Sequence, residues 1–306
     1  MLDTVQPHGT TSPLAAFVPL AVELCDLKRI RDASSPDSLA TRMFRAAWAA
    51  LLAGQDPERV ALICTANAIA AVRLGGIDAA VLRDVGLSAP DVTAVLTRGF
   101  DEVAGPIDAR LASTLRAGLG NELAAGPAPA FAEALIRQPR AGATCPGKPR
   151  IMLEPPEGHG DHCLVVAVLG AALAPVYGAS PVTAFLAGMG HHLHNAALPD
   201  SGFAGEILLG DHLMPIIARL FARELATLPA SLCDTMEAAL APIVDAATPE
   251  GRAFHAADVI DRVLQLRHFD RVAGFTIDQA LDDMDLVHAG PTQAFHMAVL
   301  RDSGLP

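Results

Sequence analysis

Nowhere does this sequence sustain the apolar–polar alternation of a half-buried strand. Its apolar residues recur at helical spacing instead, in runs that Pro and Gly interrupt. Hydrophobic residues make up 51% of the chain but aromatic residues only 4%, and Ala and Leu dominate the apolar set. Ala and Leu favour helices, whereas β-branched and aromatic residues favour strands. The sequence therefore predicts an all-α fold.

A Pro- and Gly-rich span divides the predicted helices into two groups. Residues 140–158 contain four prolines and three glycines and cannot form one helix, although 148–154 could be a short extended piece. We therefore expect an N-terminal helical half (1–139), a connector (140–158) and a C-terminal helical half (159–306). The expected helices are 14–27, 37–53, 57–73, 77–85, 89–103 and 107–124, then 160–174, 181–197, 203–226, 230–247, 251–270 and 291–301.

Charge and cysteine content argue against several function classes. The formal net charge is -12 and the 22 Lys and Arg residues are scattered, so nucleic acid polymers are not expected partners. The five cysteines include no CxxC pair and predict neither a disulfide framework nor a zinc knuckle. No basic region precedes the first apolar run, and no apolar run reaches the ~20 residues of a membrane span. We expect a cytoplasmic protein without a membrane partner.

Histidines are concentrated in one part of the second half. Five of the eleven lie between positions 159 and 194, three of them within four residues beside the apolar run FLAGMG. Burying imidazoles there is costly unless something satisfies them, and neutral imidazole is a common metal ligand. The alternative is a set of surface histidines with no shared role. We predict a metal site formed by His162, His191 and His192, with Asp258 as an oxygen ligand from a third helix.

Three runs in residues 157–270 resemble the HD superfamily of metal-dependent phosphohydrolases, and most closely its 5′-deoxynucleotidase-like branch. The run from His162 to Ala171 is similar to that branch's HS-x-x-VA-x-x-A. His191-His192 follows an apolar helix as the HD pair does, and 255–265 is similar to KAADKLDALLQ. The resemblance implies a helical bundle in which His162, His191, His192 and Asp258 hold the metal. It also implies hydrolysis of a small phosphorylated or nucleotide-like substrate.

Two positions depart from that family pattern. His192 stands where the family has the Asp of the pair, and Asn195 stands where members have an acidic proton-transfer residue. An amide does not transfer protons at neutral pH. Three histidines and one carboxylate make a softer donor set, which favours Fe, Mn, Zn, Co or Ni over Mg²⁺.

Several further residues are candidates for catalysis or substrate binding. His194, Asp200 and Glu206 would assist the reaction. Glu206 is also singled out by a weaker resemblance to ubiquinone-biosynthesis proteins that carry an HDxxH-x11-E motif, and its alternative role is a solvated helix residue. Arg219 and Arg223 lie one helical turn apart and could bind an anionic substrate, unless they belong to a solvated face.

The first half resembles the same branch in weaker form. Residues 26–51 are similar to its opening LK-x-I-x-R … ESVADHS-x-x-VA, with Arg42 in place of the first metal histidine. We therefore expect an internal duplication whose first copy lost its metal and serves structure or dimerisation, giving a homodimer. Besides the hydrolase, two functions stay open: an iron-dependent HD-type oxygenase that cleaves a small organic substrate, and a catalytically decayed signalling or scaffold module.

Overall fold

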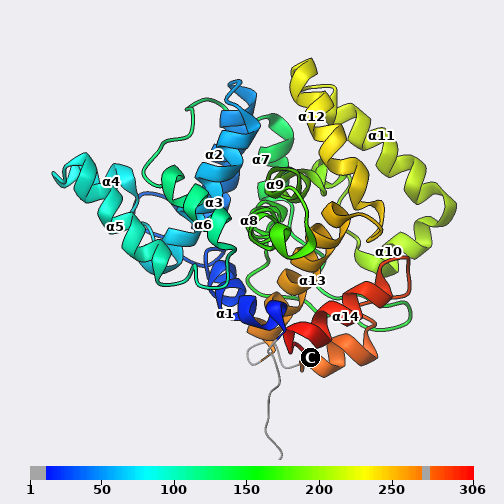
Figure 1. The fold of residues 1–306 in the computed structure, drawn as a ribbon. Helices are drawn as coiled ribbons and strands as arrows, with labels where there is room; N and C mark the ends of the chain where they lie inside the picture. The colour runs from blue at the N-terminus through cyan, green and yellow to red at the C-terminus, as the bar shows by residue number, and fades with distance from the viewer. Residues whose placement is uncertain (1–11, 271–275) are drawn as a thin grey trace, which may run out of the picture.

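A computed structural model describes residues 12–270 and 276–306 of the chain. Over these residues the protein is helical and contains no strand, which confirms the all-α prediction (Figure 1). The α-helices are α1 (Pro13–Asp26), α2 (Leu39–Leu52), α3 (Pro57–Leu74), α4 (Ala79–Asp84), α5 (Ala89–Asp101), α6 (Ala109–Gly118), α7 (Ala130–Arg137), α8 (His159–Tyr177), α9 (Pro181–Gly190), α10 (Gly202–Leu209), α11 (Leu213–Leu225), α12 (Ala230–Leu240), α13 (Pro249–Phe269) and α14 (Gln293–Ser303). Short 3-10 or π segments are η1 (Leu193–Ala196), η2 (Gly210–His212), η3 (Ala241–Val244) and η4 (Gln279–Asp283).

Most expected helices form near their expected limits, but four differ. The predicted helix 230–247 ends at Leu240 and is followed by the 3-10 segment η3. The predicted helix 203–226 is interrupted at Gly210, whose φ of 50° ends α10. The predicted helix 107–124 ends at Gly118, and the separate helix α7 was not expected. The predicted helix 181–197 stops at Gly190, because two glycines and an asparagine in GMGHHLHNA are poor helix formers. His194 therefore lies on η1 and not on a helix face shared with His191.

The two halves of the chain pack together around α8. Figure 1 shows α8 and α9 in the centre of the molecule, with α2, α7 and α13 around them, and each of these three helices contacts α8. Buried residues of both halves belong to one main hydrophobic core. The connector joins them with isolated antiparallel bridges, Pro139 to Gly158 and Ala143 to Ile151, and the latter is all that forms of the expected extended piece.

Helix α8 is the most deeply buried helix of this core. It is the one helix in the described part of the chain that is long and apolar enough to cross a membrane, yet most of it is buried inside the protein. Such burial is what the central helix of a globular core requires.

Helix α9 approaches α8 unusually closely, because both helices carry small residues at their contact. A Cβ atom on Gly188 would overlap the backbone of Ala167, so the two helix backbones nearly touch there. Since α9 runs back along α8, this contact sets the end of α9 beside the first turns of α8. That is where His191 and His162 lie.

The substitution Gly188→Ala tests this contact. The added methyl group must push α9 away from Ala167, and overpacking of this kind costs about 1–3 kcal/mol. Urea unfolding should show this loss, whereas Gly105→Ala, where nothing lies within 4 Å of the added Cβ, should change stability little. Equal stabilities of the two variants would contradict the proposed contact.

Candidate metal centre

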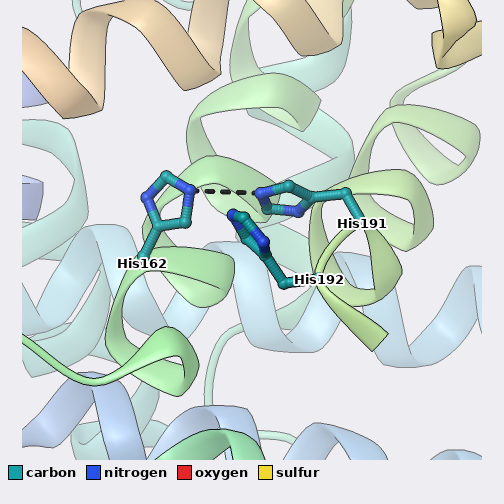
Figure 2. Close-up of side chains that lie close together, drawn as sticks. All are labelled: His162, His191 and His192. Atoms are coloured by element: carbon teal, nitrogen blue, oxygen red, sulfur yellow. Dashed lines mark hydrogen bonds between the residues drawn. The ribbon is translucent and has the colours of Figure 1, made fainter. Parts of the chain in front are cut away.

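Three helical segments bring the predicted ligands together. His162 lies in the first turns of α8, His191 and His192 directly follow α9, and Asp258 lies within α13. The three imidazoles offer ring nitrogens within 4.8 Å of one another, and Figure 2 shows the rings converging. His162 Nε2 lies 3.1 Å from His191 Nε2 and 3.3 Å from Asp258 Oδ1. The buried cluster can therefore hold a metal ion.

The outer nitrogen of each ring has an acceptor that fixes its tautomer. The Nδ1 partners are Asp261 Oδ2 at 2.7 Å from His162, the Gly188 carbonyl at 2.8 Å from His191, and Asn195 Oδ1 at 2.8 Å from His192. Asn195 Nδ2 donates to the Leu198 carbonyl, which leaves the amide oxygen to face His192. Because these oxygens accept, each Nδ1 carries a proton. Burial lowers the pKa of His191 and of His192, so these two rings are neutral and keep a lone pair at Nε2. This is the usual arrangement around metal-ligating histidines.

The spacing of these inward atoms also matches that of two ligands on one metal ion. Two ligands about 2.1 Å from one metal, at angles between 90° and 109°, lie about 3.0–3.4 Å apart. Both distances from His162 Nε2 fall in this interval. Burial lowers the pKa of His191 to about 3, so this ring is neutral at neutral pH and offers a lone pair at Nε2. The donor set can therefore hold a metal ion.

Behind His162 lies a buried chain of charges. Lys28 Nζ lies 2.6 Å from Asp261 Oδ1 and 2.5 Å from Glu157 Oε1. Burial opposes the ionisation of Asp261, but Lys28 and His162 outweigh it and hold the pKa of this carboxyl below its ordinary value. Glu157, His162 and Asp261 also come within 4.8 Å of one another, but the ammonium of Lys28 already bridges the two carboxylates.

A cleft of about 350 Å³ opens beside the histidines. Arg140 and Arg262 both line it. Arg262 lies 3.7 Å from Asp258 Oδ2, and Arg140 lies 3.4 Å from Glu157 Oε2. The remaining lining includes His191, His192, Asp200, Phe203, Phe254, Gln265 and Leu286. The cleft thus combines metal donors, two guanidinium groups and apolar walls.

Of the three predicted assisting residues, Asp200 lines the metal cleft. Burial opposes its ionisation, but hydrogen bonds from the Ala141 and Gly202 amides and the charge of Arg140 hold its pKa below the ordinary value. His194 does not line the cleft. Its ring stacks on Phe221, and burial lowers its pKa to about 4.

Glu206 faces an adjoining cavity of about 520 Å³ rather than the metal cleft. The two cavities share Phe203, Asp258, Arg262 and Leu286. Burial, together with the charge of Asp200, raises the pKa of Glu206.

The structure does not bring Arg219 and Arg223 to either cavity. Both are exposed on α11, at the edge of the molecule in Figure 1, and Arg223 pairs with Glu224. The arginines at the cleft are instead Arg140, from the connector, and Arg262. The i,i+4 spacing of Arg262 from Asp258 would have singled it out, because residues four apart share a helix face.

A comparison with protein-family models, curated proteins and solved structures finds no match. The HD-superfamily resemblance therefore stays a prediction. The all-helical fold and the buried cluster of metal donors stand on the structure itself.

The metal centre can be tested by removing one ligand. His191→Asn deletes an inward nitrogen, so the affinity of the metal-free protein for Co²⁺ should fall by at least about 100-fold. This is more than the loss expected when a residue that only hydrogen-bonds to a metal ligand is replaced. The measurement is a titration followed by visible absorption. His212→Asn, at an exposed histidine on η2, should bind like the parent. Equal affinity of the His191 variant and the parent would exclude this site.

The adjoining cavity gives a pH prediction. Burial lowers the pKa of His296 to about 4, and its Nε2 lies 3.3 Å from His255 Nδ1. In the unfolded chain His296 takes up a proton near pH 6.5, whereas in the folded protein it does so only near pH 4. The contribution of the neutral His296 to folding stability is therefore complete above pH 6.5 and is lost as pH falls towards 4. His296→Gln should therefore lose less stability over that range, by on the order of 1–2 kcal/mol. Urea unfolding in the presence of a chelator, at several pH values, measures this difference in stability. The control His212→Gln should keep the pH dependence of the parent. Identical pH profiles for His296→Gln and the parent would contradict the prediction.

Proposed function

We propose that the chain is a metal-dependent hydrolase of a small phosphorylated, nucleotide-like substrate, as its resemblance to HD-superfamily enzymes implies. One observation carries the proposal: His191, His192 and Asp258 line a cleft that also holds two arginines, and the buried His162 lies directly behind them within ligand distance of the same centre. His162, His191, His192 and Asp258 would hold Mn, Fe, Co, Ni or Zn. When bound, such a metal supplies a Lewis acid and lowers the pKa of water towards neutrality.

The charge balance around the cleft favours an anionic substrate. The charged groups that pair with one another at the cleft and behind His162 are four carboxylates and three cations: Glu157, Asp200, Asp258 and Asp261 against Lys28, Arg140 and Arg262. Their net charge of -1 becomes +1 with a divalent ion. A buried positive charge is costly unless it is paired, so a bound anion completes the site.

The cleft residues supply the remaining steps. The guanidinium groups of Arg140 and Arg262 bind phosphate oxygens, for which their planar donor geometry is suited. Asp200 is ionised and accepts a proton at its carboxylate, a role that the Asn195 amide does not perform. Phe203 and Phe254 shield the reacting groups from bulk water.

The donor set also favours a second candidate, because three imidazoles and one carboxylate suit iron. An iron-dependent oxygenase would retain iron on purification and consume O₂ with its substrate. A protein that takes up no metal, and whose stability His191→Ala leaves unchanged, would instead be the decayed scaffold module.

Elemental analysis followed by a phosphatase screen distinguishes these functions. The screen uses small phosphomonoesters, including nucleoside monophosphates, with each of the five metals added to metal-free protein. We expect release of inorganic phosphate, and none from His191→Asn. Iron retained with O₂ consumption and no phosphate release would overturn the hydrolase in favour of the oxygenase.

Substrate binding gives a separate prediction. Arg262→Gln removes one charge-assisted contact, so kcat/KM should fall about 10–100-fold, mainly through a higher KM. Arg223→Gln, on the exposed face of α11, is the matched control and should leave both constants unchanged. A kcat/KM of the Arg262 variant equal to that of the parent would remove this arginine from the substrate site.

A further inference from the structure

Lys28 is one of only two lysines among the 22 basic residues of the chain. It lies just after α1 in the N-terminal half, with its side chain 3% exposed. Its ammonium group contacts Glu157 from the connector and Asp261 on α13, which is 233 positions away in the sequence. A lysine so deeply buried needs a reason, because burying an ion pair costs about as much desolvation as the pairing returns.

The two carboxylate oxygens of Asp261 have different partners, and this gives the reason. Oδ1 faces Lys28 at 2.6 Å, and Oδ2 faces His162 Nδ1 at 2.7 Å. A carboxylate held on both sides has one orientation, and that orientation directs His162 Nε2 inward. Asp261 is fully buried, so water does not supply a substitute partner.

Other polar groups near Asp261 do not replace the ammonium. The Cys25 thiol lies 3.3 Å from Asp261 Oδ1, but burial raises its pKa and keeps it neutral. Arg29 donates to Gln265 and to the Cys25 carbonyl instead. Within the described residues, Lys28 is the one Lys or Arg side chain in ion-pair contact with Asp261.

We propose that Lys28 is a positioning residue of the metal centre, which acts on metal affinity through Asp261 and His162. The N-terminal half thereby completes a site whose ligands all belong to the C-terminal half. This goes beyond a structural or dimerising role for the first half. It rests on the proposed function only in that the site binds a metal.

Co²⁺ titration of metal-free protein tests this proposal. Lys28→Met and Lys28→Gln should bind Co²⁺ about 10–100-fold more weakly. This is the usual effect of losing a residue that orients a metal ligand without binding the metal itself. Lys148→Met, at the other, exposed lysine, should match the parent. Circular dichroism and thermal unfolding confirm that each titrated variant is folded.

A double substitution separates positioning from general stability. Asp261→Asn should weaken Co²⁺ binding to a similar extent, and adding Lys28→Gln to it should have little further effect, because both changes break the same chain of contacts. Effects that multiply, or parent affinity in Lys28→Gln, would overturn the proposal. A purely structural role would lower stability without this non-additive loss of affinity.

Two further outcomes are distinguishable. If the single variants do not fold, Lys28→Met combined with Glu157→Gln removes one charge of each sign and is titrated instead; parent affinity there overturns the proposal. If the parent protein itself binds no Co²⁺, the proposed metal-dependent function fails, and the role assigned to Lys28 fails with it.

Discussion

The close packing of α8 against α9 is the contact on which the site depends. Gly188 lies directly against Ala167, and the same glycine's carbonyl accepts the Nδ1 proton of His191. One residue therefore sets both the separation of the helices and the tautomer of a ligand. Because close-packed helices transmit small displacements, the 3.1 Å spacing of the two inward nitrogens follows from packing in the core.

A second constraint is electrostatic. The cleft lies inside a protein interior that tolerates charge only in pairs, and its carboxylates each have cationic or amide partners. The partners come from three places in the chain: Lys28 from the first half, Arg140 from the connector and Arg262 from α13. The connector, which no helical pattern describes, thus has a role in the site through Arg140 and Glu157.

Sequence patterns predict the helical fold and the histidines that converge, because helical spacing and histidine clustering are local signals. They do not predict the positions of Lys28 and Arg140, because these depend on contacts between segments far apart in the chain. Spacing alone favours Arg219 and Arg223, but spacing does not say which way α11 faces after the break at Gly210. Asp261 was within reach: it lies three positions after Asp258, on a helix whose other inward residues are mostly apolar.

The histidine at position 192 has a physical consequence for the proposed reaction. An aspartate there would add a fifth carboxylate to the paired charged groups and bring their charge with a divalent metal to zero. The imidazole instead leaves one positive charge, and Asn195 holds the ring through its amide oxygen without adding charge. If the proposed resemblance holds, the two departures from the HD pattern belong together. In the proposed hydrolase they replace a negative ligand by a neutral one, which would strengthen the attraction of the cleft for an anion and would leave proton transfer to Asp200.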